Sequence, residues 1–248
     1  MIKIIRARDR RYSDFCWLKT HWLFSFSDYY DPDNIQFGAL RVFNDDIVAP
    51  GTGFPTHPHR EMEIVTIVLD GEMTHADSMG NETVIRAGDV QRMSAGTGLT
   101  HSEFNLAGKD VHFYQIWIYP DRAGLKPSYD QRSFADVPRE NRILPVASGQ
   151  GIPDTVTFHT DATIYTGDFR QGHAATFDPG DNRRVFLYVT EGRLGVEDAE
   201  LGRGDQARIE PTHPLALEAL GDTRFVLIDV PSCKGWGYDK ATLRGAKR

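Results

Sequence analysis

Cysteine is scarce in this sequence, and long hydrophobic runs are absent. The 248 residues include two cysteines, Cys16 and Cys233, which lie far apart and form no CxxC pattern. We therefore expect no disulfide framework. No apolar run approaches the roughly 18 residues of a membrane span. The N-terminus carries charges where a signal peptide has an apolar segment. These absences predict a cytoplasmic protein without a membrane partner.

An excess of positive charge is also absent. Lys and Arg total 28 against 35 Asp and Glu, which gives a formal net charge of -7. An acidic chain gains little from neutralising phosphates, so we expect no direct nucleic-acid binding. The basic run 240–248 is the exception, and we interpret it as a solvated tail. The composition, 40% apolar and 25% charged, is that of a folded protein. We also expect a monomer.

A sustained helical pattern is missing as well. No window has an apolar period of 3.6 residues, the signature of an amphipathic helix. Instead, β-branched and aromatic runs alternate with Gly, Pro, Asp and Asn about every ten residues. Residues 64–69 form a continuous apolar run, which indicates a strand buried on both faces. The pattern predicts an all-β protein.

The chain contains a weak internal repeat. Residues 65–73 resemble residues 186–194, and Gly71 matches Gly192 at an offset of 121 residues. Residues 84–90 resemble residues 200–206, at an offset of 116. Two matches at nearly one offset indicate that the two halves share one fold.

We therefore expect two β-barrel domains joined by a linker. The first spans 1–125, and the second spans 154–231 and ends before a basic tail at 232–248. The linker, 126–153, is mostly polar and contains four prolines: Pro127, Pro138, Pro145 and Pro153.

Two short donor motifs stand out in the first half. His57-Pro-His59 and His101-Ser-Glu103 each place two donor side chains on one face of a strand, because residues two apart point the same way. If both strands face one interior, three imidazoles and one carboxylate converge. Burying such groups without partners would be costly, so the motifs predict a metal site. Imidazole and carboxylate suit Fe, Mn, Co, Ni, Cu or Zn.

The second half does not repeat these donor pairs. The offsets place the corresponding positions at Asp178, Gly180, Leu217 and Ala219. We therefore expect the metal site in the first domain alone.

The donor motifs and the glycine spacing around them resemble the two conserved motifs of the cupin superfamily. Gly51, Glu63, Gly88, Gly96 and Asn105 complete this pattern, although the loop between Gly96 and His101 is two residues longer than usual. The segments 57–60, 88–98 and 101–103 look more narrowly like the pirin family. Segments 77–81 and 114–120 look like the bacterial pirins described as quercetin 2,3-dioxygenases.

The resemblance implies a fold, a metal and a ligand set. Pirins fold as bicupins, with two jelly-roll-like cupin barrels and metal in the N-terminal barrel. The implied metal is Fe(II), with Cu, Ni, Co, Mn or Zn accepted. Carried over by position, its ligands are His57, His59, His101 and Glu103.

The choice of carboxylate ligand leaves one alternative open. In many cupins it comes from the position of Glu63, whereas in pirins it comes from the position of Glu103. Glu61 and Glu63 share the parity of His57 and His59 if the strand is regular. Glu61 departs from the glycine of many pirins, and we place it at the mouth of the pocket.

The resemblance also implies a reaction. Members of the quercetinase branch cleave flavonols with dioxygen and release carbon monoxide, so the expected partners are a small phenolic substrate and O2. Glu103, a ligand that can loosen, is the candidate base for the flavonol hydroxyl. The alternatives are a non-catalytic pirin that senses iron redox state and binds a protein, and another cupin chemistry at the same metal.

The remaining residues of interest have ordinary structural interpretations. Gln115 is expected to be a satisfied core glutamine or a polar group of the pocket. His75 and His112 are expected to be structural or surface residues. Phe43, Met62 and Met93 are expected to pack in the core or to line an apolar pocket.

Overall fold

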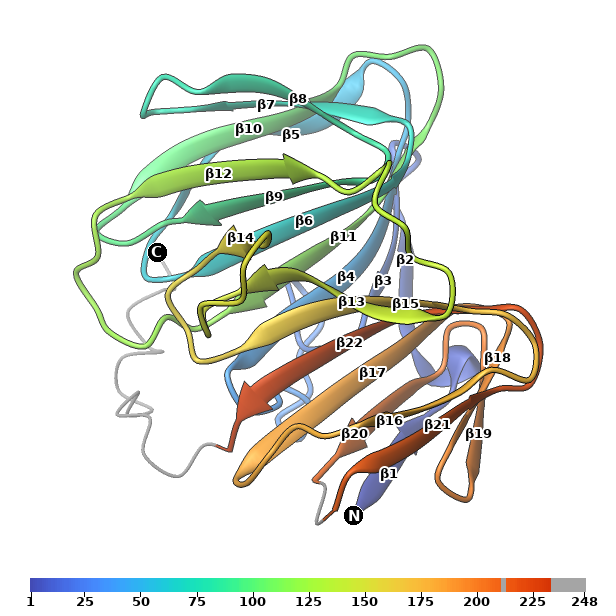
Figure 1. The fold of residues 1–248 in the computed structure, drawn as a ribbon. Helices are drawn as coiled ribbons and strands as arrows, with labels where there is room; N and C mark the ends of the chain where they lie inside the picture. The colour runs from blue at the N-terminus through green and yellow to red at the C-terminus, as the bar shows by residue number, and fades with distance from the viewer. Residues whose placement is uncertain (211–212, 233–248) are drawn as a thin grey trace.

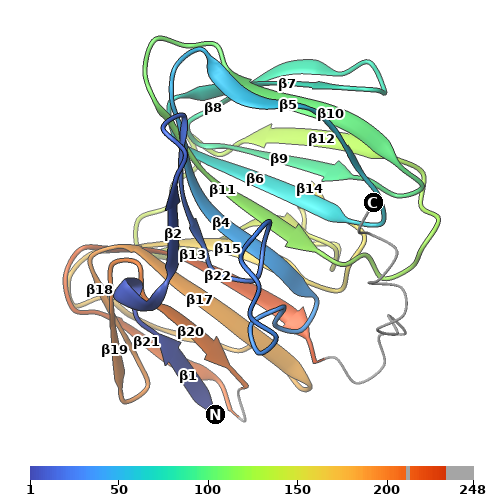
Figure 2. The ribbon, with the colours of Figure 1, turned by 180° about the vertical axis from the view of Figure 1, so that it is seen from behind.

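The computed structural model describes residues 1–210 and 213–232, which form two β-barrels side by side (Figures 1 and 2). In these ranges the helical structure is limited to the short 3-10 helix η1 (Ala7–Asp9). Neither range holds a helix with the length and apolarity to span a membrane. The predicted all-β fold is confirmed. Cys233 and the basic run 240–248 lie outside the described residues.

The first barrel closes a large sheet over a small one. The large sheet has the order β12-β9-β6-β11-β4-β3-β2, and the small sheet has the order β5-β10-β7-β8. The strands of this barrel are β2 (Arg11–Asp14), β3 (Leu18–Trp22), β4 (Leu40–Val48), β5 (Thr52–His59), β6 (Glu63–Asp70), β7 (Glu72–Asp77), β8 (Glu82–Arg86), β9 (Asp89–Ser94), β10 (Leu99–Asn105), β11 (Val111–Ile118) and β12 (Ser128–Ser133).

The second barrel has the same construction. Its sheets have the orders β1-β20-β17-β22-β15-β13-β14 and β16-β21-β18-β19. The strands are β1 (Ile2–Ile5), β13 (Arg142–Ser148), β14 (Val156–Thr157), β15 (Thr163–Phe169), β16 (Ala174–Phe177), β17 (Arg183–Glu191), β18 (Arg193–Val196), β19 (Ala199–Gly202), β20 (Gln206–Ile209), β21 (Leu215–Ala219) and β22 (Thr223–Pro231).

The sequence repeat corresponds to a repeat of topology. The order β9-β6-β11-β4 in the first barrel matches β20-β17-β22-β15 in the second. Gly71 and Gly192 occupy equivalent tight turns with φ of 78° and 75°. A Cβ at either position would lie within 2.6 Å of a backbone oxygen, so both the backbone angle and the space require glycine. The two-barrel prediction is confirmed.

Sheet membership differs from the expected domain boundaries in two places. The segment 126–153, expected as a linker, contains β12, which pairs with β9, and β13, which pairs with β15. Strand β1, expected in the first domain, pairs with β20 of the second barrel. Pro145 lies at a register shift of β13, where a strand tolerates a residue without an N–H group. Its presence therefore did not exclude a strand.

The large sheets of the two barrels pack against each other through an aromatic core. The Phe43 ring contacts the rings of Tyr114, Phe186 and Tyr188 at centroid distances of 5.0–5.3 Å. Phe43 therefore belongs to the core between the barrels and not to a pocket of the first barrel. Burial of these four aromatic side chains stabilises the relative placement of the two barrels.

Candidate metal centre

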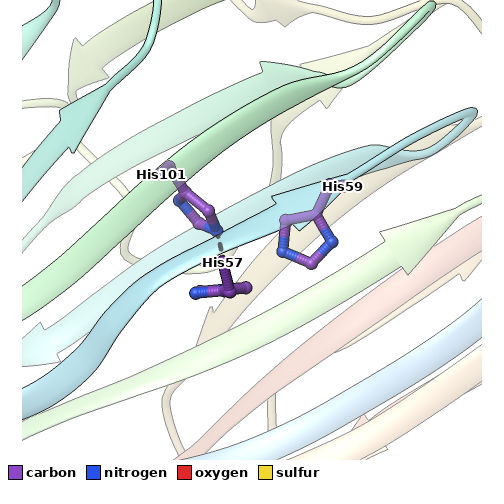
Figure 3. Close-up of side chains that lie close together, drawn as sticks. All are labelled: His57, His59 and His101. Atoms are coloured by element: carbon purple, nitrogen blue, oxygen red, sulfur yellow. Dashed lines mark hydrogen bonds between the residues drawn. The ribbon is translucent and has the colours of Figure 1, made fainter. Parts of the chain in front are cut away.

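Three of the four predicted donor side chains meet inside the first barrel. Strands β5 and β10 are antiparallel, and their register pairs His101 directly with His57 and Leu99 with His59. The three imidazole rings have centroid separations of 4.4–4.9 Å, and their donor atoms all lie within 4.8 Å of one another (Figure 3). Parity brought each pair to one face, and strand pairing brought the two pairs together.

The hydrogen bonds of His57 show which of its nitrogens faces the cluster. His57 Nδ1 lies 2.8 Å from the carbonyl oxygen of Pro55. A carbonyl only accepts, so Nδ1 carries the proton and Nε2 has its lone pair free. That Nε2 lies 3.0 Å from Nε2 of His101.

This separation and the donor types fit a divalent transition metal. Two nitrogen ligands about 2.1 Å from one ion and at right angles to each other lie about 3.0 Å apart. Burial and the neighbouring imidazole lower the pKa of His59 to about 3, and burial with three neighbouring imidazoles lowers that of His101 to about 2. Both imidazoles are therefore neutral and available as ligands at neutral pH.

Glu103 lies next to the cluster on the inner face of β10. Its donor atom and those of His75 and His101 lie within 4.8 Å of one another. Gln115 Nε2 donates to Oε2 of Glu103 at 3.0 Å. The other oxygen, Oε1, is buried and has no hydrogen-bond partner among the described residues. A buried oxygen without a donor suits a cation. Within this separation Glu103 is grouped with His75 and His101, and not with His57 and His59.

Gln115 combines its two expected roles. Its Oε1 accepts a hydrogen bond from Thr66 Oγ1 at 2.9 Å, while its amide holds Glu103. The side chain is thus a satisfied core group that also orients a donor of the site.

Glu63 does not join either group of candidate metal donors found among the described residues. Strand β5 ends at His59, Glu61 adopts a left-handed φ of 50°, and β6 begins only at Glu63. The regular strand assumed for this parity is therefore interrupted. Glu63 is buried elsewhere and accepts a hydrogen bond from Ser94 Oγ at 2.6 Å. Glu61 accepts from the backbone N–H of Gly124.

The sequence predicted a structural or surface role for His75, but the structure places this residue at the site. It is fully buried, and its Nδ1 lies 3.5 Å from Nδ1 of His101. Strand register explains this position, because β7 pairs with β10 and places His75 opposite Glu103. His112, in contrast, lies away from the site and binds Asp45 at 2.7 Å, as expected for a structural histidine.

Apolar side chains border the histidines. The Trp117 ring meets the His59 ring edge to face at 4.9 Å, and Phe26 meets Trp117 at 5.3 Å. Met93 packs with Ile64 and Leu99 in a small buried cluster against which Met62 and Trp117 also pack. The two methionines therefore have core contacts beside the site, consistent with the default expectation for them.

Burial also shifts the pKa of a carboxyl on β4, Asp46. Asp46 is 3% exposed. Burial raises its pKa to about 8 against the effect of Thr20, with a further contribution from Asp45 and Glu103. When the pKa of a carboxyl is higher in the folded chain than in the unfolded chain, the protein has its full stability at pH values below the unfolded pKa. It loses that stability as the pH rises through the folded pKa.

Asp46→Asn is therefore expected to stabilise the metal-free protein in a pH-dependent way. The gain in the free energy of unfolding should be about 2–4 kcal/mol larger at pH 8 than at pH 5. On folding at the higher pH, the Asp46 carboxyl must take up a proton or be buried as an ion, whereas an asparagine amide is neutral at both pH values. Urea unfolding at the two pH values measures it. Asp45→Asn is the control: the hydrogen bonds of His112 and Tyr188 outweigh burial and lower the pKa of Asp45, so this change should destabilise. Equal gains for Asp46→Asn at both pH values would contradict the buried neutral carboxyl.

Comparison with known proteins connects this site to a family. Residues 5–118 match the family model Pirin, and residues 145–230 match the model of the quercetinase C-terminal cupin domain. A quercetin 2,3-dioxygenase of Escherichia coli is 37% identical over 232 residues, 93% of this chain and 99% of the relative. A putative quercetin 2,3-dioxygenase of Zymomonas mobilis is 40% identical over 218 residues, 88% and 93% of the two chains.

A solved structure has nearly the same fold. The bacterial pirin YhhW from Escherichia coli, in complex with nickel(II), superposes with a TM-score of 0.89 at 36% identity. The match covers 94% of this chain and all of that one.

Proposed function

From the premise that this chain belongs to the pirin family, as its relatives show, we propose that it is a metal-dependent dioxygenase that cleaves flavonols such as quercetin. In this proposal both atoms of O2 are incorporated into the flavonol, its central heterocycle is cleaved, and one carbon of that ring leaves as carbon monoxide. The metal ligands are His57, His59, His101 and Glu103, and the metal is Fe(II).

The observation that carries the proposal is the cluster of three imidazoles beside a buried carboxylate oxygen that has no hydrogen-bond partner among the described residues. A bound divalent transition metal supplies open coordination positions where an enol-ketone and dioxygen can meet. The names of the relatives cited above favour a flavonol as the substrate class.

Glu103 performs the proton transfer in this proposal. The flavonol must lose the proton of its enol hydroxyl before it becomes electron-rich enough to react with O2, and Glu103 accepts that proton. Burial raises the pKa of Glu103 to about 7 against the hydrogen bond from Gln115. A base with a pKa near the working pH is the most effective one.

The neighbouring side chains orient the reactants. Gln115 holds one carboxylate oxygen of Glu103 through its amide, which leaves the other directed at the site. Trp117 and Phe26 supply aromatic faces beside His59, against which a planar phenolic ring can stack.

The test is direct. The purified protein is analysed for bound metal and then assayed aerobically for quercetin bleaching, with carbon monoxide measured in the headspace. Flavonol consumption with stoichiometric carbon monoxide is the expected result. Bound metal without turnover of any flavonol would overturn the dioxygenase proposal, and the same site would then be examined as a metal sensor that binds a protein.

A further inference from the structure

The turn 77–81, between β7 and β8, holds one carboxylate rigidly. Oδ1 of Asp77 accepts hydrogen bonds from the backbone N–H groups of Met79 and Asn81 at 2.9 and 3.1 Å. Oδ2 accepts from Asn81 Nδ2 at 2.8 Å and lies 3.2 Å from Nε2 of His75. The Asp77 side chain has no solvent exposure. The turn therefore fixes both oxygens, and one of them faces His75.

This contact determines which nitrogen of His75 carries the proton. An ionised carboxylate only accepts hydrogen bonds. Burial acts to raise the pKa of Asp77, but the hydrogen bonds from Asn81 and His75 outweigh it and leave the pKa below its ordinary value. Nε2 of His75 must then be the N–H, and in a neutral imidazole Nδ1 is left as an acceptor.

The acceptor of His75 faces the metal-site histidine. Nδ1 of His75 lies 3.5 Å from Nδ1 of His101 and 3.5 Å from Nε2 of Gln91. Either neighbour can approach this acceptor only as a donor. This contact favours a proton on Nδ1 of His101, which leaves the lone pair of His101 Nε2 directed toward His57.

We propose that Asp77 and His75 are positioning residues that set the tautomer and the ring orientation of His101 for metal binding. The strand register supports this role, because β7 and β10 pair His101 with Asp77 and Glu103 with His75. Pro55 fixes His57 in the same way through its carbonyl oxygen. The inference rests on the proposed metal centre, and it assigns a chemical role to the motif 77–81.

Asp77→Asn provides the first test. The amide NH2 of asparagine can donate to Nε2 of His75, which would move the His75 proton to Nδ1 and set two donors against each other at His101. Loss of such an outer partner typically weakens metal binding about 10–100-fold. The dissociation constant for Ni(II), measured by competition with a chelator, should rise by that factor. Glu82→Gln is the control, because it neutralises an exposed carboxylate on the neighbouring strand β8 and leaves the Asp77–His75 contact in place; its nickel affinity should stay near that of wild type.

The second test separates hydrogen bonding from packing. His75→Ala removes the acceptor, whereas His75→Asn can place an amide oxygen near the former position of Nδ1. We expect His75→Ala to weaken Ni(II) binding about 10–100-fold and His75→Asn to restore a large part of it. The visible spectrum of the Co(II)-loaded proteins reports ligand geometry independently of turnover.

The outcomes separate this proposal from the proposed function. Wild-type protein that binds no metal would overturn both. Wild-type binding with unchanged affinity in Asp77→Asn and His75→Ala would overturn the positioning role alone. Equal weakening in His75→Ala and His75→Asn, with identical Co(II) spectra, would also overturn it and leave His75 as a packing residue.

Discussion

His101→Ala is expected to eliminate metal binding and, with it, flavonol cleavage. His101 is the central member of the cluster, since its donor atoms belong to both groups of candidate ligands. Losing a partner of a ligand already costs about 10–100-fold in affinity, so losing the ligand itself should cost at least about 100-fold. Elemental analysis after dialysis and a nickel competition titration measure the effect.

The control for this substitution is His112→Ala. His112 is also an imidazole of the first barrel, but it binds Asp45 on the side facing the second barrel. We expect His112→Ala to retain full metal content while losing some stability, because it breaks that hydrogen bond. Full metal retention by His101→Ala would contradict the assignment of this cluster as the metal site.

Glu103→Gln is expected to lower kcat/KM for quercetin by about 10²–10⁴-fold, the usual contribution of a general base. Glutamine keeps the size of the side chain but cannot accept the enol proton. Because Glu103 is also a proposed metal ligand, the rates of the two proteins are compared per bound metal. The base must be ionised to act, so the wild-type rate should rise with pH as Glu103 ionises in the metal-loaded protein. The variant should lose that rise, and a pH profile of kcat/KM measures it.

Glu63→Gln is the matched control for Glu103→Gln. Burial raises the pKa of Glu63 to about 7, as it does for Glu103, against the hydrogen bond from Ser94. Glu63, however, lies outside the candidate metal donors of the described chain. Its replacement should leave kcat/KM and the pH profile unchanged. A loss of turnover in Glu63→Gln equal to that in Glu103→Gln would show that buried charge, and not proton transfer at the site, is the cause.

Local patterns predicted the architecture and the donors because each depends on short-range geometry. Alternation along a strand placed His57 with His59 and His101 with Glu103 on single faces. Gly71 and Gly192 marked the same turn in both barrels, because a left-handed backbone and a close backbone contact exclude a side chain there.

Local patterns failed where the chain departs from regular geometry. The parity of Glu63 relied on a continuous strand, but Glu61 interrupts it with a left-handed φ. Proline content suggested a linker at 126–153, yet Pro145 occupies a register shift within β13. Neither a bend nor a bulge has a reliable signal in a single sequence.

The sequence by itself determined the all-β class, the duplicated barrel and the His-x-His and His-x-Glu donor pairs, because all three follow from periodicity and turn chemistry. The tertiary structure alone decided which strands became neighbours. It set His101 opposite His57, brought His75 and Asp77 behind His101, and directed Glu63 away from the histidines. Pairing between strands distant in the chain depends on the packing of the whole barrel, so no local pattern encodes it.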